Sequence, residues 1–365
     1  MAVRMSRLDA PDPGVAAGRI EDLPFSNNGY WKGSAMFHKD KCNECGDCLE
    51  FCPYNRYDEN SARQEIAKLI RGGTTPILGS CITCGACNQV CPTQANPFDL
   101  INERQEQIGA LGIPNEAFER FAKLHDLPVK IEMGDPGRPV LNLCIVGAMV
   151  REQIQGPLFK GLTIVEGADY FCGVGYIHLG KPSMTARQAQ PFIDKLSGLK
   201  AAEVVCFHDD CYAMLTSLAA QYQLSVPFRP VHLFEYLYAA LSSLTERITS
   251  VGMRVAYQAP CASRYTPEKD YFLDKLFELV GVERVKREYE GLKGLCCGAP
   301  LMATDKQRAM EVKLRNISDA RENGAEAMVF LCPMCFLNLR KLCQESGMKP
   351  IFITELCSQS LIEKE

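Results

Sequence analysis

Five cysteines between residues 261 and 335 constrain the fold of this chain more than any other feature. Two gaps of equal length, residues 262–295 and 298–331, separate three groups, which are Cys261, the adjacent pair Cys296 and Cys297, and the pair Cys332 and Cys335. Four ligands complete a tetrahedral zinc ion or a cubane iron–sulfur cluster, so five thiols at one site are one too many for either. The spacing therefore predicts one multi-iron centre that is not a cubane, rather than a set of inert core cysteines. We call this group the five-cysteine centre.

A second cysteine pattern occurs twice in the first hundred residues. The runs are Cys42, Cys45, Cys48 and Cys52, then Cys81, Cys84, Cys87 and Cys91, each followed by a proline. Both runs resemble the bacterial ferredoxin pattern, in which the fourth cysteine ligates the other cluster. The resemblance implies two cubane 4Fe-4S clusters with interleaved ligands: a Cys91 set of Cys42, Cys45, Cys48 and Cys91, and a Cys52 set of Cys52, Cys81, Cys84 and Cys87. A zinc ribbon would use two cysteine pairs and leave the remaining cysteines unexplained.

The composition favours a cytoplasmic protein whose thiols hold metal. The chain has 19 cysteines in 365 residues, and the first residues, MAVRMSRLDAPDPG, lack the apolar core of a secretory signal. We therefore expect a reducing compartment, where thiols are free to bind metal. The net charge of −4, without a long basic run, argues against a nucleic-acid surface. No stretch approaches the roughly 20 apolar residues that a membrane span requires.

The five-cysteine motif, with Gly298 directly after the adjacent pair, resembles the cysteine-rich (CCG) domain of heterodisulfide reductase catalytic subunits. The resemblance covers residues from about 38 to the end of the chain and includes the D-type subunit, which fuses a ferredoxin-like domain to two CCG domains. It implies that the five cysteines bind a non-cubane 4Fe-4S cluster used for thiol–disulfide chemistry or electron transfer. Arg264 is a further catalytic candidate, because a guanidinium close to Cys261 would stabilise an anionic thiolate or carboxylate. The alternative is an Arg264 that only forms a surface ion pair.

The predicted fold class is α/β, with a helical two-cluster ferredoxin-like domain followed by two related α/β domains. Residues 1–38 are predicted to be an N-terminal extension, and residues 39–130 to form the helical domain, including a helix over 61–71 with Ser61 as its N-cap. Beyond a Pro- and Gly-rich break near residue 130, short β-rich runs alternate with helical ones, which is typical of parallel βαβ units. Strands are predicted at 140–146, 162–166, 203–207, 253–259, 327–331 and 350–354. The predicted domains are 131–248 and 249–365.

The two α/β domains are predicted to be a duplication in which only the second copy is intact. Cys172 and Cys211 match Cys297 and Cys335 at offsets of 125 and 124, and Cys144 matches Cys261 less exactly, at an offset of 117. Phe171 replaces the first cysteine of the adjacent pair, and His208 replaces the first cysteine of the last pair. The remaining metal candidates are Cys144, Cys172, Cys206, His208 and Cys211, which suit zinc, a further iron–sulfur cluster or no metal at all. His38, His125, His178 and His232 are isolated and are predicted to be ordinary surface or core residues.

The resemblance implies an iron–sulfur redox subunit of an oxidoreductase complex in anaerobic metabolism. Electrons would pass between the two cubanes, the non-cubane cluster and a flavoprotein resembling the A subunit of heterodisulfide reductase, or another donor or acceptor subunit. Similar architectures occur in iron–sulfur subunits of glycolate oxidase, of the sulfite-reduction membrane complex and of class II benzoyl-CoA reductase. With one intact motif, symmetric splitting of a disulfide between two non-cubane clusters is not available. A self-sufficient thiol–disulfide reductase and a scaffolding role stay open as alternatives.

Overall fold

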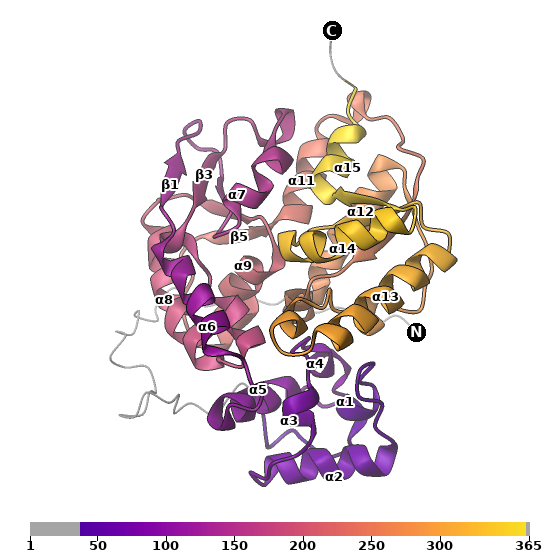
Figure 1. The fold of residues 1–365 in the computed structure, drawn as a ribbon. Coiled ribbons are helices and arrows are strands. Elements are labelled where there is room, and N and C mark those ends of the chain that lie inside the picture. Colours follow the sequence, from indigo (N-terminus) through magenta and orange to yellow (C-terminus); the bar gives the residue numbers. More distant parts are fainter. Residues whose placement is uncertain (1–36, 363–365) are drawn as a thin grey trace, which may run out of the picture.

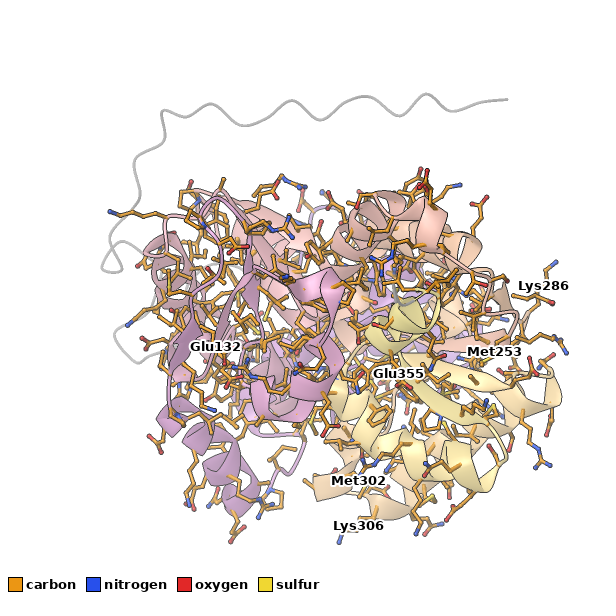
Figure 2. The ribbon with its side chains drawn as sticks, turned by 90° about the horizontal axis from the view of Figure 1, so that it is seen from above. Glu132, Met253, Lys286, Met302, Lys306 and Glu355 are labelled. Atoms are coloured by element: carbon orange, nitrogen blue, oxygen red, sulfur yellow. The ribbon has the colours of Figure 1, made fainter. Side chains whose placement is uncertain are left out.

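Figure 1 shows a computed structural model of the chain, which describes residues 37–362. The predicted N-terminal extension, residues 1–38, lies almost wholly outside the described residues. A helical part lies beneath two α/β halves, which stand side by side both in this view and when seen from above (Figures 1 and 2). The fold is therefore mixed α/β, as predicted. Among the described helices, none is long and apolar enough to cross a bilayer.

The helical part is built from short helices around the two cysteine runs. Its helices are α1 (Asp47–Glu50), α2 (Glu59–Ile70), α3 (Ile77–Ser80), α4 (Ala86–Val90) and α5 (Pro97–Ile108). Helix α2 buries Ile66 and Leu69 in a small core of their own. The predicted N-cap was wrong: Asp58 caps α2, because its carboxylate accepts hydrogen bonds from both the amide (3.0 Å) and the hydroxyl (2.7 Å) of Ser61.

The first α/β half contains a five-stranded sheet in the order β1-β3-β2-β4-β5. Four strands are parallel to their neighbours, and only β1 runs antiparallel, against β3. The strands are β1 (Lys130–Glu132), β2 (Val140–Asn142), β3 (Thr163–Glu166), β4 (Glu203–Cys206) and β5 (Arg229–His232). The helices are α7 (Gly147–Val150), α8 (Pro182–Ser197), α9 (Asp209–Ala213), α10 (Ala219–Gln221) and α11 (Leu233–Ser242). Helix α6 (Asn115–Ala122) precedes this half in sequence but packs Phe121 against Phe171 and Tyr176 within it.

The second α/β half contains a four-stranded parallel sheet in the order β7-β6-β8-β9. Its strands are β6 (Arg254–Gln258), β7 (Glu283–Arg284), β8 (Ala327–Phe330) and β9 (Lys349–Phe352). Its helices are α12 (Asp270–Val280), α13 (Lys306–Glu322), α14 (Pro333–Glu345) and α15 (Ile353–Gln359). The four parallel strands have the same spatial order in both halves. That order is β3-β2-β4-β5 in the first half and β7-β6-β8-β9 in the second. The shared order is what a duplication would produce.

The two halves share one apolar core and one buried ion pair. Helix α11 packs against α12, and the rings of Phe234 and Tyr257 meet edge to face with centroids 6.0 Å apart. Within the same interface the carboxylate of Asp209 lies 3.1 Å from Lys269 Nζ and 3.3 Å from His232 Nε2. All three polar side chains are buried. These contacts fix the first half against the second close to their cysteines.

Candidate metal centres

The five cysteines converge because the segments that carry them follow strands of one parallel sheet. Cys261 opens a 3₁₀ turn, η9 (Cys261–Tyr265), after β6, and Cys332 is the N-cap of α14 after β8. The carboxyl ends of parallel strands meet at the same edge of a sheet, which is where α/β folds place their sites. Cys296 and Cys297 reach this edge from the loop between β7 and η12 (Ala299–Ala303).

The five thiols form a continuous chain of contacts. Cys261 Sγ lies 3.7 Å from Cys296 Sγ, Cys297 contacts both Cys296 and Cys335, and Cys335 also contacts Cys332. Hydrogen bonds from Cys296 and Cys335 lower the pKa of Cys297 against the effect of burial. Contact with Cys297 and Cys332, together with burial, raises the pKa of Cys335. Thiols packed this closely without a disulfide repel one another as thiolates, so a bound cation is what would relieve the arrangement.

The backbone around Cys296 is held both by the second half and by the helical part. The carbonyl of Leu295 accepts a hydrogen bond from Gln258 Nε2 (2.9 Å), whereas the amide of Cys296 donates to the hydroxyl of Tyr54 (2.7 Å) in the helical part. Gly298 has φ +79°, and a Cβ there would come within 3.0 Å of the carbonyl oxygen of Ala309. Glycine is therefore required directly after the adjacent cysteine pair.

The eight cysteines of the helical part gather in two groups. Cys48 is surrounded by Cys91, Cys45 and Cys42, and burial followed by these neighbours raises its pKa to about 12. Cys87 is surrounded by Cys81, Cys84, Cys48 and Cys52, and burial and these neighbours raise its pKa as well. One small cavity is lined by Cys48 as well as by Cys52, Cys81, Cys84 and Cys87. The structure thus brings Cys91 to the first run and Cys52 to the second.

Three cysteines and one histidine meet in the first half. The sulfur atoms of Cys144, Cys172 and Cys211 all lie within 4.8 Å of one another, and those of Cys144 and Cys172 are 3.9 Å apart. The His208 side chain hydrogen-bonds to Cys144, and its Nδ1 accepts from the amide of Asp210 (3.2 Å), which leaves Nε2 for a ligand. Burial raises the pKa of Cys144, but hydrogen bonds from Cys172, Cys211 and His208 lower it overall. We call these four residues the Cys144 set.

Cys206 does not join this group of sulfurs. It is the last residue of β4, it is fully buried, and its pKa is raised by burial and by the charge of Cys144. The Cys144 set has the ligand types and the ligand count of a closed Cys₃His structural zinc site. In such sites the four ligands surround one ion tetrahedrally.

The candidate centres lie next to one another. Cys84 of the Cys52 set is close enough to Cys261 for the charge of that thiolate to raise its pKa, after the larger effects of burial and of Arg264. His178 Nδ1 lies 3.0 Å from the hydroxyl of Thr83, between Cys81 and Cys84, and His178 also lowers the pKa of Cys297 after the larger effects of its thiol neighbours. The sequence presents His178 as an isolated histidine, and only the packing of the first half places it here.

Arg264 lies between the helical part and the loop that leads to Cys296. Its guanidinium donates to Gln89 Oε1 (3.1 Å) and to the carbonyl oxygens of Gly291 (2.7 Å) and Gly294 (2.8 Å). Its positive charge opposes the effect of burial on the pKa of Cys84. Arg264 therefore supports a loop and faces a cysteine of the Cys52 set.

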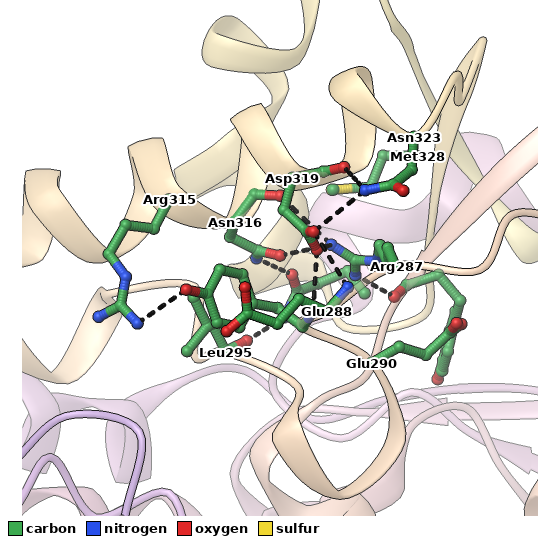
Figure 3. A network of polar contacts seen from close by, with 12 residues as sticks. Arg287, Glu288, Glu290, Leu295, Arg315, Asn316, Asp319, Asn323 and Met328 are labelled. Carbon is green, nitrogen blue, oxygen red and sulfur yellow. Dashed lines mark hydrogen bonds and ion pairs between the residues drawn. The ribbon is translucent and has the colours of Figure 1, made fainter. Parts of the chain in front are cut away.

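A buried polar network behind the five-cysteine centre was not predicted. Asn316 links Gln258 to Arg287, and Asp319 accepts hydrogen bonds from the amides of Glu288 and Tyr289 (Figure 3). The guanidinium of Arg287 also donates to the carbonyl of Tyr257 (2.9 Å). No cysteine spacing signals these residues, because they are brought together only by α13 packing on the sheet.

Comparison with known proteins identifies both cysteine-rich regions. The 4Fe-4S dicluster domain matches residues 34–96, which include both ferredoxin-type runs. The cysteine-rich CCG domain matches residues 255–340, which include the whole five-cysteine centre. The D subunit of dihydromethanophenazine:CoB–CoM heterodisulfide reductase from Methanosarcina acetivorans is 22% identical over 373 residues, covering 83% of this chain and 89% of that protein. The chain is a homologue of this D subunit.

A second relative belongs to another oxidoreductase. The B subunit of fumarate reductase (CoM/CoB) from Methanothermobacter marburgensis is 22% identical over 368 residues, covering 86% of this chain and 70% of that protein. These homologues confirm the predicted resemblance and the assignment as an iron–sulfur oxidoreductase subunit. A crystal structure of a hypothetical protein from Helicobacter pylori has a TM-score of 0.51 at 12% identity, covering 76% of this chain and 61% of that chain. At this identity the likeness concerns the fold alone.

Proposed function

We propose that this subunit passes single electrons between two cubane 4Fe-4S clusters, held by the Cys91 and Cys52 sets, and one non-cubane 4Fe-4S cluster at the five-cysteine centre. The observation that carries the proposal is the continuous chain of five thiols beside Cys84 of the Cys52 set. The bound clusters supply one-electron redox chemistry. The chain itself supplies the thiolates, the burial and the hydrogen bonds that tune it.

The Cys52 set lies between the Cys91 set and the five-cysteine centre on this electron route. Its Cys87 is close to Cys48 of the Cys91 set, whereas its Cys84 is close to Cys261. The segment that carries Cys42 and Cys45 of the Cys91 set also carries the exposed residues Lys41, Asn43 and Asp47, so this end is the one offered to solvent and to a partner. Electrons therefore enter or leave the subunit at the Cys91 set. A flavoprotein resembling the A subunit of heterodisulfide reductase is the partner that suits this exchange.

Iron analysis of anaerobically purified protein tests the cluster count. Three four-iron clusters correspond to about twelve irons per chain, and two cubanes alone to about eight. About twelve irons are expected. A content of about eight in the wild-type protein would remove the non-cubane cluster and, with it, the proposed electron route.

A matched pair of variants assigns the third cluster. Cys297→Ser removes the middle thiol of the five-cysteine centre and is expected to lose about four irons. Cys343→Ser is the control, because Cys343 is also buried in the same half, where its sulfur lies 3.8 Å from the sulfur of Met328. It is expected to retain all the iron. Equal iron contents in the two variants would contradict the assignment.

For the first half we propose a zinc ion held by Cys144, Cys172, Cys211 and His208. Its support is the compact, buried group of three thiols, together with the hydrogen bond between the His208 side chain and Cys144. Cys172→Ser is expected to lose the zinc and keep the iron, whereas Cys206→Ser, whose sulfur lies outside this group, is expected to keep both. Loss of iron from Cys172→Ser would show that the first half holds an iron–sulfur cluster instead.

A further inference from the structure

The peptide bond between Leu295 and Cys296 is anchored on both of its polar groups. Its carbonyl accepts from Gln258 Nε2 in the second half, and its N–H donates to Tyr54 Oη in the helical part. The residue that carries the first thiol of the adjacent pair is thus positioned jointly by two domains. Neither anchor is a cysteine, and neither follows from the spacing of the cysteines.

The anchor on the Gln258 side is rigid. Gln258 is buried, and its amide oxygen accepts from Asn316 Nδ2. Asn316 Oδ1 accepts in turn from Arg287 (2.8 Å), and Figure 3 shows these two side chains facing each other. Buried polar groups whose hydrogen bonds are satisfied hold a single arrangement. The carbonyl of Leu295 therefore stays in place while the other side of the peptide meets Tyr54.

The anchor on the Tyr54 side belongs to a segment docked on the second half. Three successive residues, 53–55, each contact it: the carbonyl of Pro53 accepts from Arg315 (3.4 Å), Tyr54 Oη accepts from Cys296, and Asn55 Oδ1 accepts from Arg308 (3.3 Å). This segment directly follows Cys52. Tyr54 is thus two residues from Cys52, a ligand of one proposed cluster, and its hydroxyl contacts Cys296, a ligand of another.

The hydroxyl of Tyr54 lies close to cysteines of two candidate centres. Because Tyr54 Oη accepts the amide of Cys296, its own proton must point to a different acceptor. Burial, and then the charges of Cys84, Cys296 and Cys261, raise the pKa of Tyr54, which places these three thiols near the hydroxyl. Sulfur is therefore the acceptor that these surroundings offer.

We propose that Tyr54 is a positioning residue that raises the reduction potential of the five-cysteine centre by holding Cys296 and donating its O–H to sulfur. The inference rests on the proposed function. Hydrogen bonds to the sulfurs of a cluster set its potential, because they stabilise the reduced, more negative state. A cluster held by the Cys52 set would lose the electron that a cluster at the five-cysteine centre would gain, and the Tyr54 proton would stay on its oxygen.

A redox titration of Tyr54→Phe, followed by electron paramagnetic resonance, tests this role. The variant keeps the ring and removes only the hydroxyl. Because the variant loses a hydrogen bond to a charged group, its five-cysteine centre is expected to be harder to reduce than that of the wild type. At a fixed potential, the ratio of reduced to oxidised centre should be about tenfold lower in the variant. The two cubane signals are expected to titrate as in the wild type. Tyr236→Phe is the matched control, because it removes a buried tyrosine hydroxyl that donates to the carbonyl of Leu158 in the first half (2.5 Å).

The possible outcomes separate the role of the Tyr54 hydroxyl from the proposed function. An unshifted titration of the five-cysteine centre in Tyr54→Phe would overturn the role of the hydroxyl, as would an equal shift in Tyr236→Phe. Loss of about four irons from Tyr54→Phe would also overturn it, because the hydroxyl would then be needed for assembly rather than for tuning. A wild-type protein with only the two cubane signals would instead refute the proposed function itself.

Discussion

Asp209 is the residue whose charge ties the two α/β halves together. His232 Nδ1 accepts from the amide of Phe234 (3.1 Å), so its proton lies on Nε2 and points to the carboxylate of Asp209. Burial alone would raise the pKa of Asp209, but the charge of Lys269 and the contact with His232 lower it to about 2. The carboxylate is therefore ionised, with Lys269 as its buried counter-charge. Lys269 also donates to Ser263 (2.8 Å), two residues after Cys261.

We predict that Asp209→Asn destabilises the protein strongly. The substitution leaves the Lys269 ammonium buried with only the half-exposed Asp270 as a counter-charge, and breaking a buried pair in this way costs about 3–5 kcal/mol. Urea unfolding under anaerobic conditions measures the loss. Asp169→Asn is the control, because its pair with Lys195 is largely exposed and should matter little. Similar unfolding midpoints for both variants would contradict the prediction.

At the scale of elements, the parallel strands decide where the cysteines meet. Cys144 follows β2 and His208 follows β4 in the first half, just as Cys261 follows β6 and Cys332 follows β8 in the second. In each half these two strands are direct neighbours, β2 with β4 and β6 with β8. Residues that are far apart in sequence therefore reach one sheet edge without any long connection. Two such edges, one in each half, face the helical part and each other.

The strands that sequence analysis missed are edge or near-edge strands with unfavourable composition. β5 contains Pro230 and β7 spans only two residues, and both lie at the edge of their sheets. Proline cannot donate to the ladder, so it is tolerated at an edge, where one side of the strand has no neighbour. Pro350 occupies the same place in β9 and pairs with Met328, as Pro230 pairs with Val204. The central strands were all predicted, and so was the edge strand β9, whose Ile351 and Phe352 are buried.

Helix α2 supplies a test of its N-terminal cap. Asp58→Ala removes the acceptor for the amide of Ser61, so that amide is expected to exchange its hydrogen faster, because the first turn frays. Hydrogen exchange read by mass spectrometry over residues 58–70 measures the change. Glu59→Ala keeps the cap and removes only an exposed pair with Arg63, and unchanged exchange is expected. Faster exchange in both variants alike would show that the cap is not the cause.

At the scale of the whole molecule, three parts meet around the five-cysteine centre. The helical part contributes Tyr54 and Thr83, the first half contributes His178, and the second half contributes the thiols. The guanidinium of Arg315 joins two of these parts, because it donates to the carbonyl of Pro53 and to Tyr289 Oη (3.1 Å) and stacks over the Tyr289 ring at 5.0 Å. The relative position of the parts therefore depends on a few polar contacts.

We predict that Arg315→Met loosens the helical part without removing a cluster. Losing these hydrogen bonds costs about 0.5–1.5 kcal/mol each, which should raise hydrogen exchange in residues 53–55 and 289–296. Iron content is expected to stay unchanged. Arg340→Met is the control, because Arg340 is exposed and lies over the ring of Phe336 within its own half. Unchanged exchange in Arg315→Met would mean that other contacts alone hold the helical part.

The sequence by itself determined the chemistry, because metal ligation depends on residue type and local spacing. The two runs and the adjacent pair before Gly298 indicated an iron–sulfur protein related to heterodisulfide reductase, and the homologues confirm this. Alternation of buried β-rich runs with helical ones was enough for the α/β class. The helical sequence around Cys343 and Cys357 also indicates packing residues, and both are buried in α14 and α15.

Only the tertiary structure decided which groups surround the thiols. From the sequence alone, Cys206 and His208 are equally plausible metal ligands. In the structure, the turn after β4 brings the imidazole of His208, and not the sulfur of Cys206, to Cys144. Tyr54 and Gln258 act on Cys296 from segments more than thirty residues away, through contacts that exist only once the domains dock. Local pattern reports which atoms can bind a metal. The long-range packing of three domains sets the hydrogen bonds and charges that those atoms experience, and no local pattern encodes it.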